Sequence, residues 1–213
     1  MKLKKLLAAA LAAAWLLGLA GCASQAIAAN DLTKNVKKAE QTVFLDEAAQ
    51  DKAIEDLTAF GVKLLQKEMG KTDPLLSPLS IAAALSMTAN GAVGETKTQM
   101  EAVLGASTET LSSSFAALQS ALKNDKQLKL ANSIWLKDTP TLHVEDAFLQ
   151  KNADCFGAGI YAAPFDDSTK TAINDWVKEK TDGMIPEILD KISADSVMYL
   201  VNALAFDAKW EDI

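Results

Sequence analysis

Few of the side chains that usually carry covalent chemistry occur in this chain. Its 213 residues include one His, His143, and two Cys, Cys22 and Cys155. A Ser-His-Asp triad needs a His beside a nucleophile, and a zinc site needs three or four nitrogen, sulfur or oxygen ligands. His143 is predicted to lie on the surface at the start of a helix, and no CxxC or HxxxH spacing occurs. The sequence therefore predicts no catalytic residue, no metal site and no cofactor, in a protein that is not an enzyme.

Two further groups of reactive residues have structural interpretations. Asp166 and Asp167 could form an acid pair or bind calcium, but they directly precede a helical pattern and are interpreted as a turn that caps the helix. Cys155 ends another helical pattern and has no predicted disulfide partner, so it is interpreted as a half-buried small apolar residue.

Cys22 is the residue with the clearest chemical assignment. Three Lys among the first five residues precede the apolar run 6–20, whose 15 residues fall short of the ~20 needed to span a bilayer. The tetrad Leu19-Ala20-Gly21-Cys22 then resembles a bacterial lipobox, in which the nucleophilic Cys thiol is acylated and becomes the first mature residue. An ordinary secretory signal with an incidental Cys is the alternative.

The lipobox resemblance implies a location and an organisation of the N-terminal region. Residues 1–22 are expected to be a lipoprotein signal peptide, and 23–41 a polar tether between the lipid and the folded domain. The protein is then expected outside the cytoplasm, attached to the bacterial cell envelope, with the membrane as a partner through its lipid anchor.

Composition favours one folded domain and excludes one class of partner. Hydrophobic residues make up 49% and charged residues 23% of the chain, which suits a sizeable core rather than disorder. The formal net charge is −7, whereas nucleic-acid binding requires a basic face that releases counterions. We therefore expect no nucleic-acid partner.

Apolar spacing predicts early helices and interspersed strands. Helices are predicted over 42–69, from Pro78 onward, and over 94–104, 110–122, 144–156 and 168–180, with Ser77 and Ser168 as N-caps. Strands are predicted over 128–136, 159–163 and 196–206. Alternation in the first strand places Asn132, Ile134 and Leu136 on one face. These elements indicate an α+β fold in which helices pack on a sheet.

Five segments, in order along the chain, resemble the serpins, a family of serine protease inhibitors. Pro74–Met87 resembles the family's Ser-Pro-x-Ser-Ile segment, and Gly91–Met100 is similar to its Gly-Ala-x-Gly-x-Thr-x-x-Gln motif. The other three segments are Leu130–Trp135, Phe165–Ile192 and Tyr199–Glu211, the last of which runs from an apolar strand into Lys-Trp-Glu. Together they cover most of the chain after about Phe44.

The resemblance implies a fold and a function. Residues 42–213 are expected to form the N-terminal part of a serpin domain, with helices packed on part of a large mixed sheet. Serpins inhibit serine proteases through a reactive-centre loop, which is expected beyond the end of this chain, so the chain alone is expected to be inactive. A serine protease is the expected partner of a full-length form. A non-inhibitory, membrane-tethered binding lipoprotein is the alternative.

The resemblance also assigns structural roles to four residues. Ser77, Ser80 and Asn202 match serpin residues that meet beneath the centre of the sheet, in the shutter region where the sheet opens. An unpaired buried polar group of this kind costs ~1–3 kcal/mol. Trp210 matches the Trp of the breach, where the loop first inserts. The alternatives are that Ser77 only caps a helix, that Ser80 faces solvent and that Trp210 is a plain core aromatic. Asn90 is expected to lie on the surface.

Overall fold

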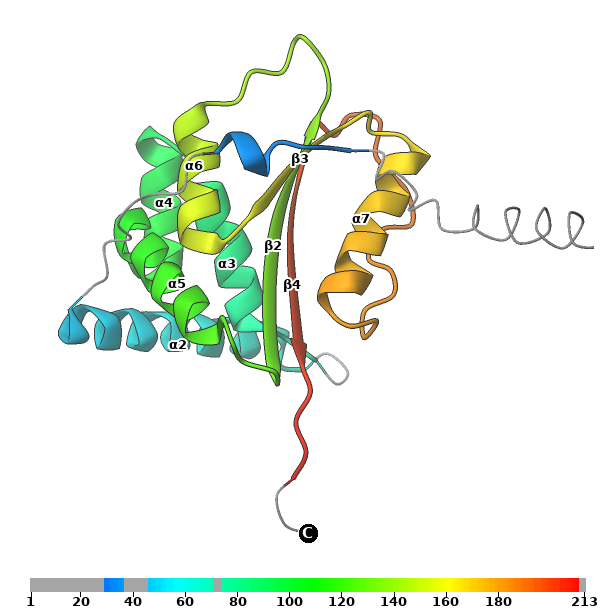
Figure 1. Cartoon of the computed structure of the whole chain (residues 1–213). Coiled ribbons are helices and arrows are strands. Elements are labelled where there is room, and N and C mark those ends of the chain that lie inside the picture. Colours follow the sequence, from blue (N-terminus) through cyan, green and yellow to red (C-terminus); the bar gives the residue numbers. More distant parts are fainter. Residues whose placement is uncertain (1–28, 37–45, 71–73, 211–213) are drawn as a thin grey trace, which may run out of the picture.

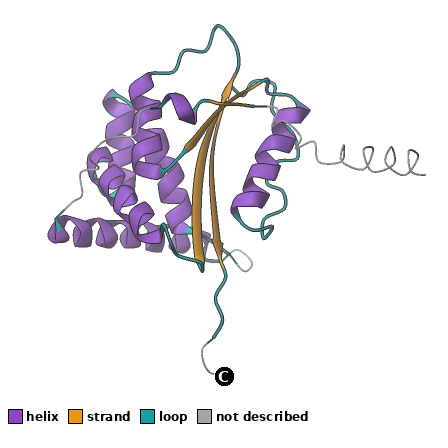
Figure 2. Cartoon of the chain, viewed as in Figure 1, coloured by secondary structure: helices purple, strands orange, loops and turns teal. Residues whose placement is uncertain are grey.

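A computed structural model describes residues 29–36, 46–70 and 74–210. Helices lie on both faces of one sheet: α2 to α6 cover one face, and α7 alone covers the other (Figures 1 and 2). The elements in chain order are β1 Asn30–Asp31, η1 Thr33–Asn35, α2 Glu47–Glu68, α3 Pro78–Ala89, α4 Gly94–Leu104, α5 Thr108–Leu122, β2 Leu128–Lys137, α6 Asp146–Phe156, β3 Gly159–Ala163, α7 Asp167–Lys180 and β4 Met198–Phe206. The predicted α+β class is confirmed.

The sheet is mixed, and its strands run in the order β1-β3-β2-β4. β2 is central and pairs parallel with β3 and antiparallel with β4. The antiparallel register places Asn132 directly opposite Asn202, and Trp135 opposite Tyr199. The three strands predicted from the sequence are thus neighbours, and β1 is an additional edge strand that the pattern did not predict.

Strand alternation divides the core between the two faces of the sheet. Ile134 and Leu136 of β2 belong to the cluster under α3, α5 and α6, as the alternation of that strand predicted. Trp135 belongs to the opposite cluster with Ile173 and Val177 of α7, and its ring stacks on that of Tyr161 at 4.5 Å. A sheet buried on both faces explains why β4 is nearly all apolar.

The helix starts follow from their caps. Asp46 accepts a hydrogen bond from the Ala49 N–H at 2.8 Å, so α2 begins at Glu47 and not at residue 42. Asp166 accepts from the backbone N–H groups of Ser168 and Thr169, and it is therefore the N-cap of α7 in place of the predicted Ser168. These bonds confirm that the acidic pair at 166–167 is a capping turn, and the bond from the Ser168 hydroxyl lowers the pKa of Asp166.

The range 23–41, predicted to be a tether, contains a docked portion. Residues 29–36 lie along the edge of β3, where Asn30 pairs with Ala162 and Asp31 with Tyr161. This portion differs from the predicted tether because its backbone groups satisfy the otherwise open edge of β3. The signal peptide and Cys22 lie outside the described residues. In the part of the chain that the structure describes, no helix has the length and apolarity needed to cross a membrane.

Candidate functional site

Two serines meet where α3 begins, below the sheet. Ser77 is extended and caps α3 by accepting from the Ser80 N–H at 3.3 Å, and its hydroxyl donates to the Ser80 hydroxyl at 2.9 Å. Pro78 occupies the first turn, where its missing N–H costs nothing. Both serines are half-buried. Ser77 is thus the predicted N-cap of α3 and is also bonded to the half-buried hydroxyl of Ser80.

The turn at Pro78 is packed closely against α2. A Cβ added to Gly61 would lie 3.0 Å from the Pro78 Cβ, a separation shorter than van der Waals contact. A side chain at this position of α2 would therefore push the two helices apart. Gly61 thus permits the close approach of α2 to the first turn of α3.

A pair of asparagines joins the two longest strands. The Asn202 Nδ2 of β4 donates to the Asn132 Oδ1 of β2 at 2.8 Å, as their opposed register permits. Asn132 is 2% exposed, and its own Nδ2 donates to the Phe156 carbonyl at 2.8 Å. Gln119 Nε2 donates to the same carbonyl at 2.9 Å. One chain of bonds therefore runs from β4 through β2 and the end of α6 to α5.

The Phe156 carbonyl is free to accept these bonds because α6 ends there. Gly157 adopts a left-handed conformation, with φ 60°, and terminates the helix. The last carbonyls of a helix have no partner within the helix and need one elsewhere. Asn132 and Gln119 supply that partner. The end of α6 is in this way fastened to the central strand and to α5.

Asn202 keeps one unsatisfied group. Its Oδ1 is buried and has no hydrogen-bond partner among the described residues. A buried acceptor in that state costs ~1–3 kcal/mol, and a donor brought next to it would recover that cost. The strand centre therefore contains an acceptor that is available to a further donor.

The structure brings together some of the predicted shutter residues and separates others. Ser77 and Ser80 are bonded to each other, whereas Asn202 is bonded to Asn132, and no hydrogen bond among the described residues joins the two pairs. Both pairs lie on the same face of the sheet, since α3 packs against β4 there. The predicted partner of Asn202 was a serine or nearby backbone; the observed one is Asn132, because the register places their side chains opposite.

Asn90 is not the surface residue that the sequence suggested. Its Nδ2 donates to the Asn152 Oδ1 at 3.0 Å, and its Oδ1 accepts from the Ser112 hydroxyl at 3.1 Å. Asn152 is fully buried and also donates to the Phe148 carbonyl at 3.1 Å. These bonds connect α3, α5 and α6 behind the sheet. The expectation for Asn90 was wrong because its two partners are distant in sequence.

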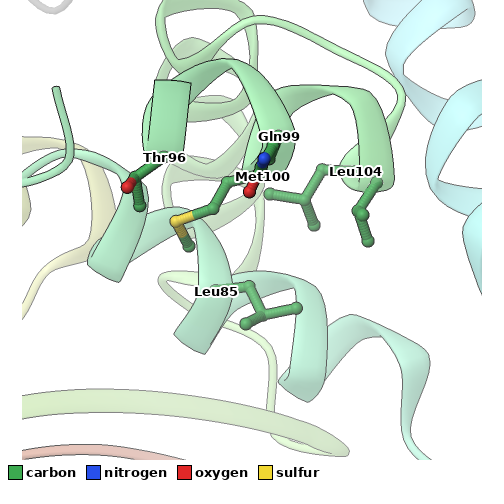
Figure 3. Close-up of a pocket in the computed structure, with 6 residues that line it drawn as sticks. Leu85, Thr96, Gln99, Met100 and Leu104 are labelled. Carbon is green, nitrogen blue, oxygen red and sulfur yellow. The ribbon is translucent and has the colours of Figure 1, made fainter. Parts of the chain in front are cut away.

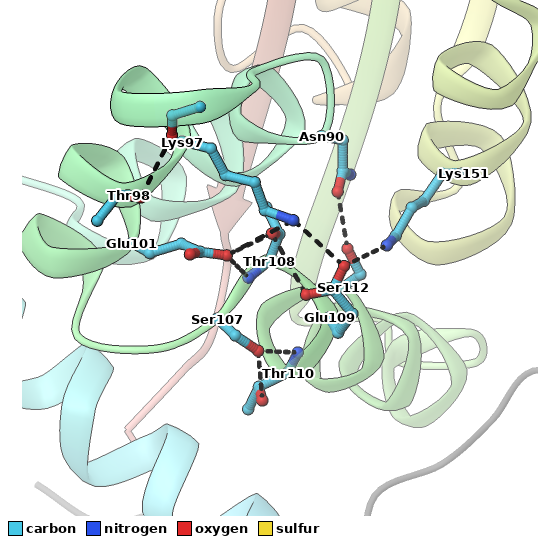
Figure 4. A network of polar contacts seen from close by, with 11 residues as sticks. Asn90, Lys97, Thr98, Glu101, Ser107, Thr108, Glu109, Thr110, Ser112 and Lys151 are labelled. Atoms are coloured by element: carbon cyan, nitrogen blue, oxygen red, sulfur yellow. Dashed lines mark hydrogen bonds and ion pairs between the residues drawn. The ribbon is translucent and has the colours of Figure 1, made fainter.

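A surface network links α4, α5 and α6 near this buried group (Figure 4). Glu101 accepts from the Thr108 N–H at 2.7 Å and from its hydroxyl at 2.5 Å, and these bonds lower the pKa of Glu101. Glu109 lies 3.5 Å from the Lys97 Nζ and 3.6 Å from the Lys151 Nζ. Each exposed ion pair contributes little to stability, about 0–1 kcal/mol. The network therefore positions the helices and offers no reactive group.

An apolar hollow of about 260 Å³ lies between α3 and α4 (Figure 3). It is lined by Leu85, Thr96, Gln99, Met100, Val103 and Leu104. Ligand sites are usually larger and combine apolar walls with converging polar groups. The two polar side chains here include no charged group, so the hollow has no evident chemistry.

The remaining candidates show no reactive environment. His143 is exposed and lies 3.6 Å from Glu145, outside α6. Cys155 is a half-buried free thiol, and burial raises its pKa, which disfavours the reactive thiolate. Trp210 is 89% exposed at the end of the described chain, so it is not a core aromatic there. Within the described ranges, no group of three or more His, Cys, Asp or Glu could hold a metal ion.

Comparison with known protein families gives one consistent match. The family model described as "Serpin (serine protease inhibitor)" matches residues 55–213. Leukocyte elastase inhibitor of Sus scrofa is 34% identical over 146 residues, which cover 64% of this chain and 38% of that protein. Plasma protease C1 inhibitor of Mus musculus is 29% identical over 170 residues, which cover 78% of this chain and 33% of that protein.

Solved structures give the same result. A loop C-sheet serpin polymer superposes with a TM-score of 0.74 at 42% identity, over 83% of this chain and 47% of that chain. The thermophilic serpin tengpin in its native state superposes with a TM-score of 0.72 at 40% identity, over 87% of this chain and 48% of that chain. The chain thus spans less than half the length of these relatives, and it matches their N-terminal portion.

Proposed function

Because the chain belongs to the serpin family, we propose that it is part of a serine protease inhibitor that is anchored to a membrane through Cys22. The matched curated proteins named above are protease inhibitors, which supports a protease as the partner. The Leu19-Ala20-Gly21-Cys22 tetrad supports the anchor and a place at the outside of the bacterial cell envelope. Trp210 keeps its proposed breach role, by resemblance.

Beyond the family match, the observation that best supports the proposal is the pair of asparagines, Asn132 and Asn202, in an otherwise apolar part of the sheet. The serpin resemblance implies that a protease cleaves the reactive-centre loop, which then enters the sheet as a new strand. A strand that enters the sheet needs groups on the neighbouring strand to which it can bond. β4 is an outer strand of the described sheet, and the Asn202 Oδ1 at its middle is a buried acceptor without a partner among the described residues.

The two serines have a related role in this proposal. Ser77 and Ser80 satisfy each other at the start of α3, on the face of the sheet that contains Asn202. A hydroxyl can rotate between donor and acceptor partners without moving its backbone. We therefore assign Ser77, Ser80 and Asn202 to the shutter and add Asn132, which the sequence resemblance did not identify.

The direct test is formation of a covalent complex with a protease. A full-length form that carries the reactive-centre loop, isolated from membranes, is mixed with elastase-, trypsin-, chymotrypsin- and subtilisin-like enzymes and analysed by denaturing electrophoresis; the 213-residue chain alone is expected to form no complex. An SDS-stable band at the mass of the protease plus the part of the inhibitor before the cleaved bond is expected with at least one enzyme. The same enzyme with its active-site serine blocked is the control and should give no such band. Digestion without a complex in every case would contradict inhibition and favour a binding lipoprotein.

A further inference from the structure

The N-terminal segment 29–36 is fastened to the domain by its backbone. Asn30 and Asp31 pair with Ala162 and Tyr161 of β3, and the Leu32 N–H donates to the Ile160 carbonyl at 2.8 Å. These bonds continue the sheet beyond β3 in the manner of an added strand. The segment is therefore a part of the folded domain and does not act as a linker.

Side chains of the same segment strengthen this attachment. The Thr33 hydroxyl accepts from the Ile160 N–H at 2.8 Å, so a side chain continues the bonding where β1 has ended. Leu32 and Val36 pack into the cluster on the α3 side of the sheet, and Ala29 packs into the cluster on the α7 side. Apolar contacts on both faces hold the segment more firmly than edge pairing alone.

The docked segment shortens the reach of any anchor at Cys22. Seven Cα-to-Cα steps join Cys22 to Ala29, which at full extension span at most about 25 Å. A free tether up to Gln41 would have spanned more than twice that, about 65 Å. A domain of this size is about 40 Å across. The available chain is thus shorter than the domain that it would anchor.

The attachment point also lies at one end of the sheet. Asp31 pairs with Tyr161, which pairs with Trp135 near the Lys137 end of β2. The other end of β2, at Leu128, is nine residues away, or about 30 Å along the strand. Figure 1 shows β1 at the end of the sheet opposite to the one from which the chain leaves β4. The two ends of the sheet would therefore stand at different heights above an anchoring membrane.

We propose that the docked segment 29–36 holds the β1–β3 end of the sheet against the lipid surface that carries the Cys22 anchor. This inference rests on the proposed lipidation of Cys22. Charge does not supply the orientation, because the net charge of −7 gives no attraction to an anionic leaflet. The short chain between Cys22 and Ala29, together with the fixed position of segment 29–36 on β3, supplies the orientation. The Leu128 end of the sheet then points away from the membrane.

Energy transfer to a membrane dye tests this orientation on the lipidated full chain. Cys155 is replaced by Ala, and a donor fluorophore is attached through Asp138→Cys near the docked segment or Lys126→Cys at the far end, both exposed positions. Vesicles of phosphatidylethanolamine and phosphatidylglycerol carry a headgroup acceptor. Transfer from position 138 is expected to exceed transfer from position 126 at least twofold.

Two insertions provide a matched pair. Twenty Gly/Ser residues placed between Ala28 and Ala29 lengthen the anchor and should abolish the difference between the probes. The same twenty residues placed between Val36 and Lys37 lie beyond the docked segment and should leave the difference intact. Equal transfer from both probes in the original chain, or equal loss with both insertions, would overturn the proposal.

Flotation of the vesicles separates failure of the anchor from failure of the orientation. A chain that does not float with the vesicles overturns the lipid anchor and this proposal together. A chain that floats but shows no difference between the probes overturns the orientation alone and leaves the anchor standing. Leu32→Asp, which places a charge in an apolar contact of the segment, should behave like the insertion before Ala29.

Discussion

The bond between Asn132 and Asn202 should be the most informative contact to break. Asn202→Leu removes the donor of the 2.8 Å bond and leaves the Asn132 Oδ1 unpaired in a side chain that is 2% exposed. Stranding a buried acceptor costs ~1–3 kcal/mol. Removing the already unsatisfied Asn202 Oδ1 offsets part of that cost. We therefore expect a loss of about 1–2 kcal/mol in the free energy of unfolding.

Replacing the partner, Asn132, should lower the free energy of unfolding by at least as much. Asn132→Leu leaves both polar atoms of the Asn202 amide without a partner, although the Phe156 carbonyl keeps its bond from Gln119 at 2.9 Å. When both partners are replaced by apolar groups of similar shape, the cost is nearly neutral, because no buried group is then stranded. The double variant Asn132→Leu/Asn202→Leu should therefore lose less than the sum of the single variants, with a coupling of about 1 kcal/mol or more.

Urea unfolding followed by tryptophan fluorescence measures these differences, because Trp135 is fully buried in the same strand. With an m-value of about 2 kcal/mol/M, a loss of 1–2 kcal/mol lowers the midpoint by about 0.5–1 M. Asn124→Ala, at an exposed position, is the control and should leave the midpoint unchanged. Strictly additive single effects would refute the argument that the two amides form one unit.

The same contact makes a prediction about sheet opening. In a complete serpin that contains these residues, Asn202→Ala should raise the rate of polymer formation on mild heating, because it removes the side-chain bond between β4, an outer strand of the described sheet, and β2. Size-exclusion chromatography of heated samples measures this rate. Asn124→Ala should match the original protein, whereas Asn90→Ala is unsuitable as a control because it breaks buried bonds to Asn152 and Ser112. Equal rates for Asn202→Ala and the original protein would remove the shutter assignment.

Three further outcomes are expected. Cys22→Ser should block processing or release the protein from membranes in fractionation, since the thiol is the acyl acceptor; unchanged partitioning would contradict lipidation. Gly61→Val should lower the unfolding midpoint by an amount equivalent to ~1–3 kcal/mol, because even its Cβ would lie 3.0 Å from that of Pro78. Thr108→Val should reduce the acid sensitivity of unfolding. Hydrogen bonds from the Thr108 hydroxyl and N–H lower the pKa of Glu101 in the folded protein. These bonds therefore stabilise the folded state fully above pH ~4.3, the pKa of an unfolded Glu, and the stabilisation is lost as the pH falls through the lower pKa of folded Glu101. Identical midpoints for both proteins from pH 3 to 6 would contradict this.

Local signals predicted most helices and strands, although they misplaced the first residues of α2 and the N-cap of α7. Ser77 and Pro78 predict the start of α3, and the alternation in 128–136 predicts which residues of β2 share a face, with Ile134 and Leu136 in the cluster under α3, α5 and α6. Asn132 could have been found in the same way, since a polar residue on the inward face of a strand needs a partner. Its pairing with Asn202 required the register of two strands 70 residues apart, which no local pattern supplies.

The failures at β1 and Asn90 share one physical cause, which is long-range pairing. The strand Asn30–Asp31 is only two residues long, so it has no detectable period, and Thr33 is 127 residues from its partner Ile160. Asn90 ends a helix, where a polar residue normally faces water, but its amide meets Asn152 from α6. In both cases tertiary structure provides the bonds that the local sequence leaves open.

The unequal covering of the sheet has a consequence for how the protein exchanges its amide hydrogens. On the α3 side, hydrogen bonds and apolar contacts tie the strands to several helices. On the other side, α7 and the chain that follows it contact the strands through one apolar cluster and a few polar contacts, which include the Lys129–Asp182 ion pair, the 3.0 Å bond from the Ser193 N–H to the Tyr199 hydroxyl and the 2.9 Å bond from the Lys137 N–H to the Val197 carbonyl. Deuterium should therefore enter α7 and residues 181–197 by local opening, while the amides of β2 exchange only on global unfolding. The molecule would then consist of a slow-exchanging body and a faster-exchanging outer layer, with the sheet as the boundary between them.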